Sequence, residues 1–362
     1  MRFLLRLLVI LAILAALAWA ALEYLALRAV RSAADGGAFR LAGSQMLTDP
    51  RRIGIRMEGM DFSDGAGGTV LSDLTVWLVP WKLNEVRTAL PAQTVMQTPA
   101  GDMVLAVTDG AASARFSPTH RMALAAASLS AGAVSLDGTP MLDHASIHAE
   151  MTGYGAWIPP RAAAAYRIST TIEGAPLGQI LDRMDILPPP DSPRPEGRLS
   201  LGGPLVVWLT AAPGPMAAAD PELIGLTLEG VTLNIDGYEA RLWGRILADE
   251  AGLAEGELAI DSTDPRGFVM QLSALGLMPD AFAPLAATTL EAAAMWQAER
   301  ETTEAPAPLS PGSPDLTAQR DRRGDAPIPP RAEGLQRIPL IFREGRSYLG
   351  ALPIGPAPML AP

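Results

Sequence analysis

The chain contains no cysteine. Disulfide bonds, thiolate metal sites and a cysteine nucleophile are therefore excluded. Histidine is nearly as scarce, with 3 residues, and aromatic side chains make up only 5% of the chain. Lys82 is the only lysine, so all other basic side chains are arginines.

Basic residues are fewer than acidic ones, 28 against 39. The formal net charge is −11 at pH 7, and a chain without a basic field cannot release counterions from phosphates, which argues against a nucleic-acid partner. The 34 glycines and 33 prolines are typical of a protein with many turns and strand ends. A length of 362 residues is enough for one large domain or two ordinary ones.

The longest apolar segment lies near the N-terminus. Residues 7–22 carry no charge and include nine leucine, isoleucine and valine side chains, which contribute roughly −3 to −5 kcal/mol to membrane insertion. Arg6 can snorkel, which lengthens the span toward the about 20 residues that a membrane helix needs. We expect a single-pass inner-membrane anchor, with the bulk of the chain in the periplasm.

A cleaved signal peptide is the alternative. Residues 18–20 read Ala-Trp-Ala, which resembles a cleavage site. Leu22, Tyr24 and Leu25 continue the apolar pattern beyond this site, which favours the uncleaved anchor. In the alternative, the protein is secreted to the periplasm, so both interpretations export the remainder of the chain.

The exported part is predicted to be mainly β with a few helices (α+β). In residues 226–261, apolar residues alternate on both sides of Asp236-Gly237, a hairpin signal, and the alternation slips at Glu229-Gly230, which indicates a bulge. This region predicts a β-meander. We expect a curved or two-layer antiparallel sheet of meanders, preceded by one N-terminal transmembrane helix.

Further alternation predicts strands elsewhere, and a 3.6-residue period predicts helices. The expected strands begin at Arg52, include one continuous strand over 70–79 and one over 198–210 that is interrupted at 202–204, and end with a hairpin around Glu344-Gly345. The expected helices cover residues 177–184, 265–278 and a segment from Asp280 to about Arg300.

These elements suggest four segments. They are a membrane anchor and stalk (1–32), an exported β-rich domain (33–300) with a sub-boundary near 187–197, a disordered proline-rich and charged insert (301–333), and a closing hairpin with a proline-rich tail (334–362).

No motif in the chain carries recognisable chemistry. His144 and His148 are spaced like zinc ligands on a helix, but the surrounding alternation predicts a strand, where they lie about 13 Å apart. No G-x-S-x-G nucleophile elbow is present. We therefore expect no catalytic residues, no metal ligands and no cofactor.

Tryptophan gives the one candidate for a binding surface. Trp77, Trp208 and Trp243 lie in predicted strands and could line an apolar groove. The alternatives are interfacial contact near a bilayer and an ordinary role as core aromatics.

The C-terminal third resembles a known family. The segment over 226–260, followed by a helix pair and by "GLQRIPLIFREGRSYLGALPIGPAPML", is similar to a bacterial family catalogued as domain of unknown function 2125. The middle segment "LTVWLVPW" through "LPAQTVMQTPAGDMVLAV" is similar to it as well. The resemblance implies an envelope protein but brings no activity and no functional residues. A looser similarity, in strand style only, is to AsmA-like envelope proteins.

Three functions are compatible with these observations. The first is a non-enzymatic protein that binds lipid or another apolar ligand in envelope homeostasis. The second is an interaction or assembly protein with an envelope protein partner. The third, and least favoured, is a hydrolase that uses scattered carboxylates.

Overall fold

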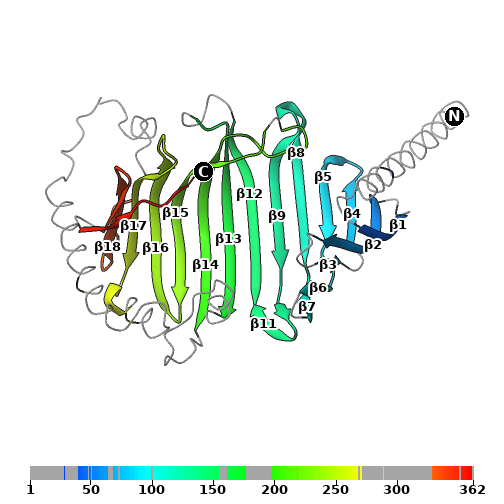
Figure 1. Ribbon diagram of the computed structural model, residues 1–362, viewed down its shortest axis with the longest axis horizontal. Helices are drawn as coiled ribbons and strands as arrows, with labels where there is room; N and C mark the ends of the chain where they lie inside the picture. Colours follow the sequence, from blue (N-terminus) through cyan, green and yellow to red (C-terminus); the bar gives the residue numbers. More distant parts are fainter. Residues whose placement is uncertain are drawn as a thin grey trace, which may run out of the picture. The chain divides into compact units, whose positions relative to one another are not determined.

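The structure, a computed structural model, is mainly β (Figure 1). The expected anchor (7–22), the helix over 177–184, the helix after Asp280 except residue 288, and residues 301–327 lie outside the described residues. No helix among the described residues has the length and apolar character to cross a membrane. The structure describes residues 28, 40–47, 49, 51–63, 68–71, 74–98, 101–154, 161–176, 197–217, 219–267, 270, 288, 328–349 and 352–360.

The chain divides into two compact units. Unit 1 comprises Met1–Thr119 and Ala125–His144, and unit 2 comprises His120–Leu124 and Ala145–Pro362. The strands on either side of residues 187–197 pair with each other, so that segment connects two neighbours within unit 2.

Unit 1 is organised around its second strand. On one edge β2 pairs with β1, and on the other edge it pairs with both β3 and β4. From there the pairing runs through β5 to β8 in one direction and through β6, β7 and β10 to β11 in the other. The strands are β1 (Arg40–Met46), β2 (Ile53–Ser63), β3 (Gly68–Leu71), β4 (Leu74–Val79), β5 (Lys82–Ala89), β6 (Gln93–Thr98), β7 (Gly101–Val107), β8 (Ala111–Ser117), β9 (Ala123–Ala131), β10 (Val134–Leu136) and β11 (Thr139–Leu142), with one 3-10 turn (Pro118–His120) after β8.

The single strand expected over residues 70–79 is instead two strands. β3 pairs with Met60–Ser63 of β2, whereas β4 pairs with Ile53–Met57. Gly59 lies between these halves with φ of +58°, a left-handed conformation that breaks the regular course of β2. Each half of β2 therefore takes its own partner. Both halves contribute to one core cluster, in which Ile55 and Met57 from the half next to β4 and Met60 from the other half pack against Leu74 and Val76.

Unit 2 is an antiparallel meander. From β13 to β20, each strand pairs with the next one along the chain, and Figure 1 shows β12 beside β13. The strands are β12 (His144–Tyr154), β13 (Ala164–Pro176), β14 (Arg198–Leu209), β15 (Leu223–Ile235), β16 (Tyr238–Ala248), β17 (Ala254–Ser262), β18 (Gln336–Arg343), β19 (Arg346–Leu349) and β20 (Leu352–Pro356).

The meander predicted over residues 226–261 is confirmed as β15, β16 and β17. Asp236 and Gly237 form the first turn with φ of +50° and +89°, and the Gly237 amide donates to Asn234 Oδ1 at 3.0 Å. The expected bulge is also present, because the register between β15 and β16 shifts between Glu229 and Val231. Local sequence signals were therefore sufficient to predict this part of the fold.

Two other strands differ from the expectation. β14 runs without a break through residues 202–204, although its register with β15 shifts there. A glycine pair therefore distorts the ladder locally without ending the strand. At the C-terminus, the second arm of the predicted hairpin around Glu344-Gly345 is two strands, β19 and β20, which pair with each other.

The predicted helix after β17 has the expected start. Residues 265–267 are helical, and the Gly267 amide donates to Asp264 Oδ1 at 2.7 Å. Asp264 is therefore the N-cap, and Pro265 occupies the first helical position, where a missing N–H costs nothing. Most of the remaining predicted helix, to residue 278, lies outside the described residues.

Candidate apolar binding face

The sheet of unit 2 has one continuous apolar face. The register places Ile168 of β13 opposite Leu205 of β14, which lies opposite Leu228 of β15. The same alignment repeats for Ile172, Leu201 and Leu233. We call this surface the apolar face. It comprises Ile168, Ile172, Leu199, Leu201, Leu205, Val207, Leu226, Leu228, Leu233 and Leu242.

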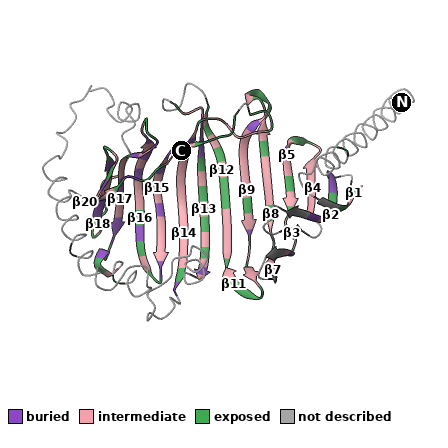
Figure 2. Cartoon of the chain, in the orientation of Figure 1, coloured by how far each residue is buried: buried purple, intermediate pink, exposed green. Residues whose placement is uncertain are grey.

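The apolar face is only half-buried. All ten side chains are intermediate in exposure, and Figure 2 shows intermediate residues along nearly all of β14, from Leu199 to Leu209. Along β14 the apolar side chains run from Leu199 to Val207, about 26 Å at 3.3 Å per residue. A leaflet of the bilayer core is roughly 15 Å thick, half of the whole. The apolar face is therefore long enough for an extended acyl chain.

One side of the apolar face ends in a closed core. Ile246, Leu258 and Phe342 are buried there with Ala254 and Ala357, and Leu226 and Leu228 of the apolar face pack against them. β16, β17 and β18 thus supply most of this buried cluster, whereas nine of the ten half-buried residues of the apolar face belong to β13, β14 and β15.

The opposite face of the same sheet is polar. Arg167 pairs with Glu229 at 3.1 Å. The Arg245 guanidinium donates to Thr227 Oγ1 at 3.0 Å and lies 4.7 Å from the centre of the Trp208 ring. This ion pair and this hydrogen bond join neighbouring strands on the polar face, so the two sides of the sheet differ in chemistry.

The three predicted tryptophans are not brought together on the apolar face. Trp77 belongs to β4 in unit 1, where the Arg52 guanidinium lies 5.0 Å from its ring. Trp208 and Trp243 are in unit 2, and the register places both on the polar face, opposite Gly225 and Glu229. Trp208 is 5% exposed and packs with Ala165 and Ile224 in a small cluster of its own.

The apolar face was not predicted from the sequence, although the alternation that produces it can be seen there. Leu199, Leu201, Leu205 and Val207 alternate along β14. The strand was expected, but the pairing that aligns it with Ile168 joins residues more than 30 positions apart.

Tyr166 is buried on the apolar side of the sheet, near the N-terminal end of β13. It is 3% exposed, and its hydroxyl donates to the Leu124 carbonyl oxygen at 2.7 Å. Burial, and secondarily the nearby Tyr154, raises the pKa of Tyr166 to about 12. The hydroxyl therefore stays protonated and satisfied at physiological pH.

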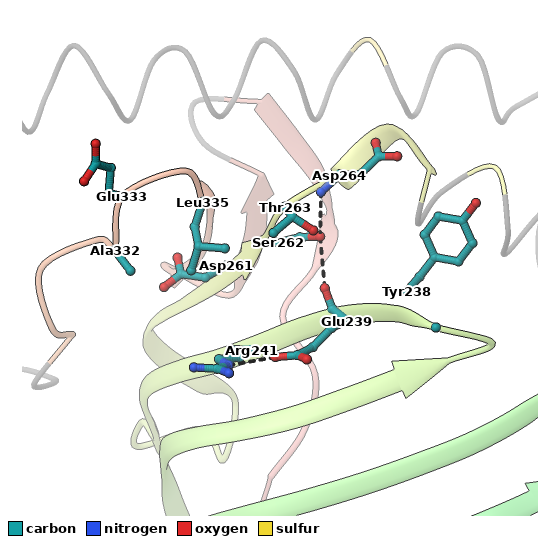
Figure 3. A pocket seen from close by; sticks show the side chains of 11 residues that line it. Tyr238, Glu239, Arg241, Asp261, Ser262, Thr263, Asp264, Ala332, Glu333 and Leu335 are labelled. Carbon is teal, nitrogen blue, oxygen red and sulfur yellow. Dashed lines mark hydrogen bonds and ion pairs between the residues drawn. The ribbon is translucent and has the colours of Figure 1, made fainter.

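A polar pocket lies beside the turn of β15 and β16 (Figure 3). Its volume is about 600 Å³. In it, Ser262 donates to the Glu239 carbonyl oxygen at 3.1 Å and accepts from the Asp264 amide at 3.3 Å, and Arg241 pairs with Glu239 at 2.8 Å. These groups satisfy one another, so the pocket walls are structural.

The histidines do not form a metal site within the described part of the chain. His144 and His148 lie in β12, and the centre of the His120 ring lies 4.9 Å from that of Tyr154, with the two rings tilted by 56°. No group of three or more His, Cys, Asp or Glu among the described residues could hold a metal ion.

Unit 1 contains a buried carboxylate whose ionisation supports folding. Arg87 donates to Glu85 Oε1 at 2.6 Å, Lys82 lies 3.6 Å from the other oxygen, and chiefly the Arg87 hydrogen bond lowers the pKa of Glu85 below 4.5. A carboxyl group whose pKa is lower in the folded state than in the unfolded state stabilises the fold at pH values above its unfolded pKa. That stability is lost as the pH falls through the folded pKa.

We predict that Glu85→Gln weakens the decrease in the urea unfolding midpoint between pH 5 and pH 3, a window set by the ordinary glutamate pKa of about 4.3. An unchanged decrease contradicts this role.

The fold and the apolar face define a class of protein: a large antiparallel β-sheet protein with one apolar and one polar sheet face. The family model described as "Uncharacterized protein conserved in bacteria (DUF2125)" matches residues 16–311, and the chain belongs to that family. The matched residues include the middle segment and the meander, whereas the C-terminal hairpin lies beyond them. Comparison with curated proteins and with solved structures gave no match, so the similarity to AsmA-like proteins has no support there.

Proposed function

We propose that this protein binds an apolar molecule, most simply a lipid acyl chain, along the apolar face of unit 2. The observation that carries the proposal is the row of half-exposed leucine, isoleucine and valine side chains across β13, β14 and β15. A ligand that covers these side chains gains about 25 cal/mol of favourable free energy for each Å² of apolar surface removed from water. Ligand sites are typically apolar, with few polar groups.

The expected membrane anchor fits this function. A protein tethered to the inner membrane, with its bulk in the periplasm, has access to lipid at one membrane surface. The role we propose is non-enzymatic: the apolar face contains no titratable side chain among its ten residues, so it can bind and shield an acyl chain but has no group to move a proton or attack a bond.

The test is to purify the full chain in mild detergent and quantify co-extracted lipid by mass spectrometry. We expect a lipid at stoichiometric amount. The double variant Leu201→Asp/Leu205→Asp should reduce it by about tenfold or more, because an acyl chain cannot cover a carboxylate without a large desolvation cost.

The matched control uses the other face of the same strand. Ser200 neighbours Leu201 but lies opposite Asn234 on the polar face, so Ser200→Asp should retain the lipid. Circular dichroism checks that each variant is folded. A folded wild-type chain without stoichiometric lipid, or equal retention by Leu201→Asp/Leu205→Asp and Ser200→Asp, would refute the proposal and favour the assembly role.

A further inference from the structure

The link between β4 and β5 in unit 1 exposes large apolar side chains. Val79 pairs with Lys82, so only Pro80 and Trp81 connect the two strands. Trp81 is 74% exposed and Leu83 is 53% exposed. These are the largest exposed fractions of large apolar side chains within unit 1's described residues.

The turn itself does not need a tryptophan. Proline suits the first central position because its φ is preset, and the second position ordinarily carries glycine, asparagine, aspartate or serine. By comparison, Trp77 on β4 is half-buried beneath Arg52. Trp81 therefore adds an exposed indole ring that neither the turn nor the core uses.

Leu83 and two cations follow Trp81 along β5, and a third cation lies on the neighbouring strand β8. Trp81 occupies the second turn position and Leu83 is the second residue of β5, so two large exposed apolar side chains lie within two positions of each other. Lys82 and Arg87 flank Glu85 on β5, and Arg115 of β8 is the register partner of Glu85. Three cations around one carboxylate make this a basic spot in a chain of net charge −11.

We propose that the β4–β5 link inserts into the headgroup region of an anionic phospholipid membrane. Tryptophan prefers the membrane–water interface, lysine can snorkel from it to the headgroups, and cations are attracted to anionic lipid. The expected span supplies proximity: β1 begins at Arg40, 18 residues after Leu22, which limits the tether to about 60 Å. The proposal does not depend on lipid binding at the apolar face.

The absence of cysteine makes a direct test available. A single cysteine, Leu83→Cys, carries a nitroxide label in the full chain reconstituted into phosphatidylethanolamine and phosphatidylglycerol vesicles. Spin relaxation by oxygen, which is enriched in lipid, is compared with relaxation by a water-soluble nickel complex. We expect a severalfold higher oxygen-to-nickel ratio than for the matched label at Ala89→Cys, an exposed position at the other end of β5.

A second substitution separates insertion from local burial. Adding Trp81→Ser to Leu83→Cys should return the ratio toward the Ala89→Cys value. Equal ratios at positions 83 and 89 would overturn the proposal. Protection that vanishes on diluting protein into excess lipid would also overturn it, since that result identifies a second copy of the chain as the occupant.

Discussion

Replacement of Asp261 by asparagine should lower the free energy of unfolding by about 3–5 kcal/mol, since it leaves a buried arginine without its counter-charge. Asp261 and Arg337 are each 4% exposed. The guanidinium donates to both carboxylate oxygens at 2.7 Å, and its remaining nitrogen donates to the Pro329 carbonyl oxygen at 2.7 Å. This bidentate geometry is the strongest form of the pair.

The Asp261–Arg337 pair joins two strands that are far apart in the sequence. Asp261 lies opposite Arg337 in the register of β17 and β18, strands that are separated by residues 263–335. The pair therefore fixes the C-terminal hairpin to the meander. Urea unfolding of Asp261→Asn, followed by circular dichroism, measures the effect.

An exposed pair provides the control. Glu239 and Arg241 are joined at 2.8 Å but are 45% and 53% exposed, so Glu239→Gln should cost no more than about 1 kcal/mol. The apolar double variant Asp261→Leu/Arg337→Met should recover much of the lost stability, because it buries no charge. A change below about 1 kcal/mol in Asp261→Asn itself would contradict the argument.

Gly244→Val should destabilise unit 2 by about 2–5 kcal/mol, the combined cost of backbone strain and overpacking. Gly244 has φ of +118°. A Cβ there would collide with the Glu257 carbonyl oxygen and would lie 2.8 Å from the Leu258 Cα atom. Both obstacles are backbone atoms of β17, the adjacent strand, so no side-chain rotation can relieve the contact.

Gly237→Ala is the matched control for Gly244→Val. Gly237 also has a positive φ, +89°, but a Cβ there would meet nothing within 4 Å. Its cost should be limited to the conformational term of about 1 kcal/mol. The difference between the two urea midpoints isolates the steric term, and equal midpoints would show that β17 does not approach Gly244 as closely as described.

Local signals predicted much of the sheet. Asp236-Gly237 and Glu344-Gly345 were recognisable turns because their sequences suit positive φ. The start of the helix predicted from residue 265 is likewise confirmed, with Asp264 as its N-cap. Each of these features depends on a few neighbouring residues, which is why one sequence suffices to find it.

Long-range pairing could not be predicted in the same way. Asp261 and Arg337 look like ordinary polar strand residues until β17 meets β18. Trp208 and Trp243 were proposed as groove residues from their aromatic character, which does not reveal the face on which a side chain lies. Only the register, which places Trp208 beside Gly225, assigns the face.

The bulge at Gly230 keeps the apolar side chains before and after it on the same side of the sheet. Leu226 and Leu228 occupy even positions in the sequence, whereas Val231 and Leu233 occupy odd ones. In a regular strand, where side chains alternate, the two sets would point in opposite directions. The extra residue between Glu229 and Val231 resets the alternation. Because of this one glycine, the apolar side chains of both halves of β15 point to the same side of the sheet and form one hydrophobic surface.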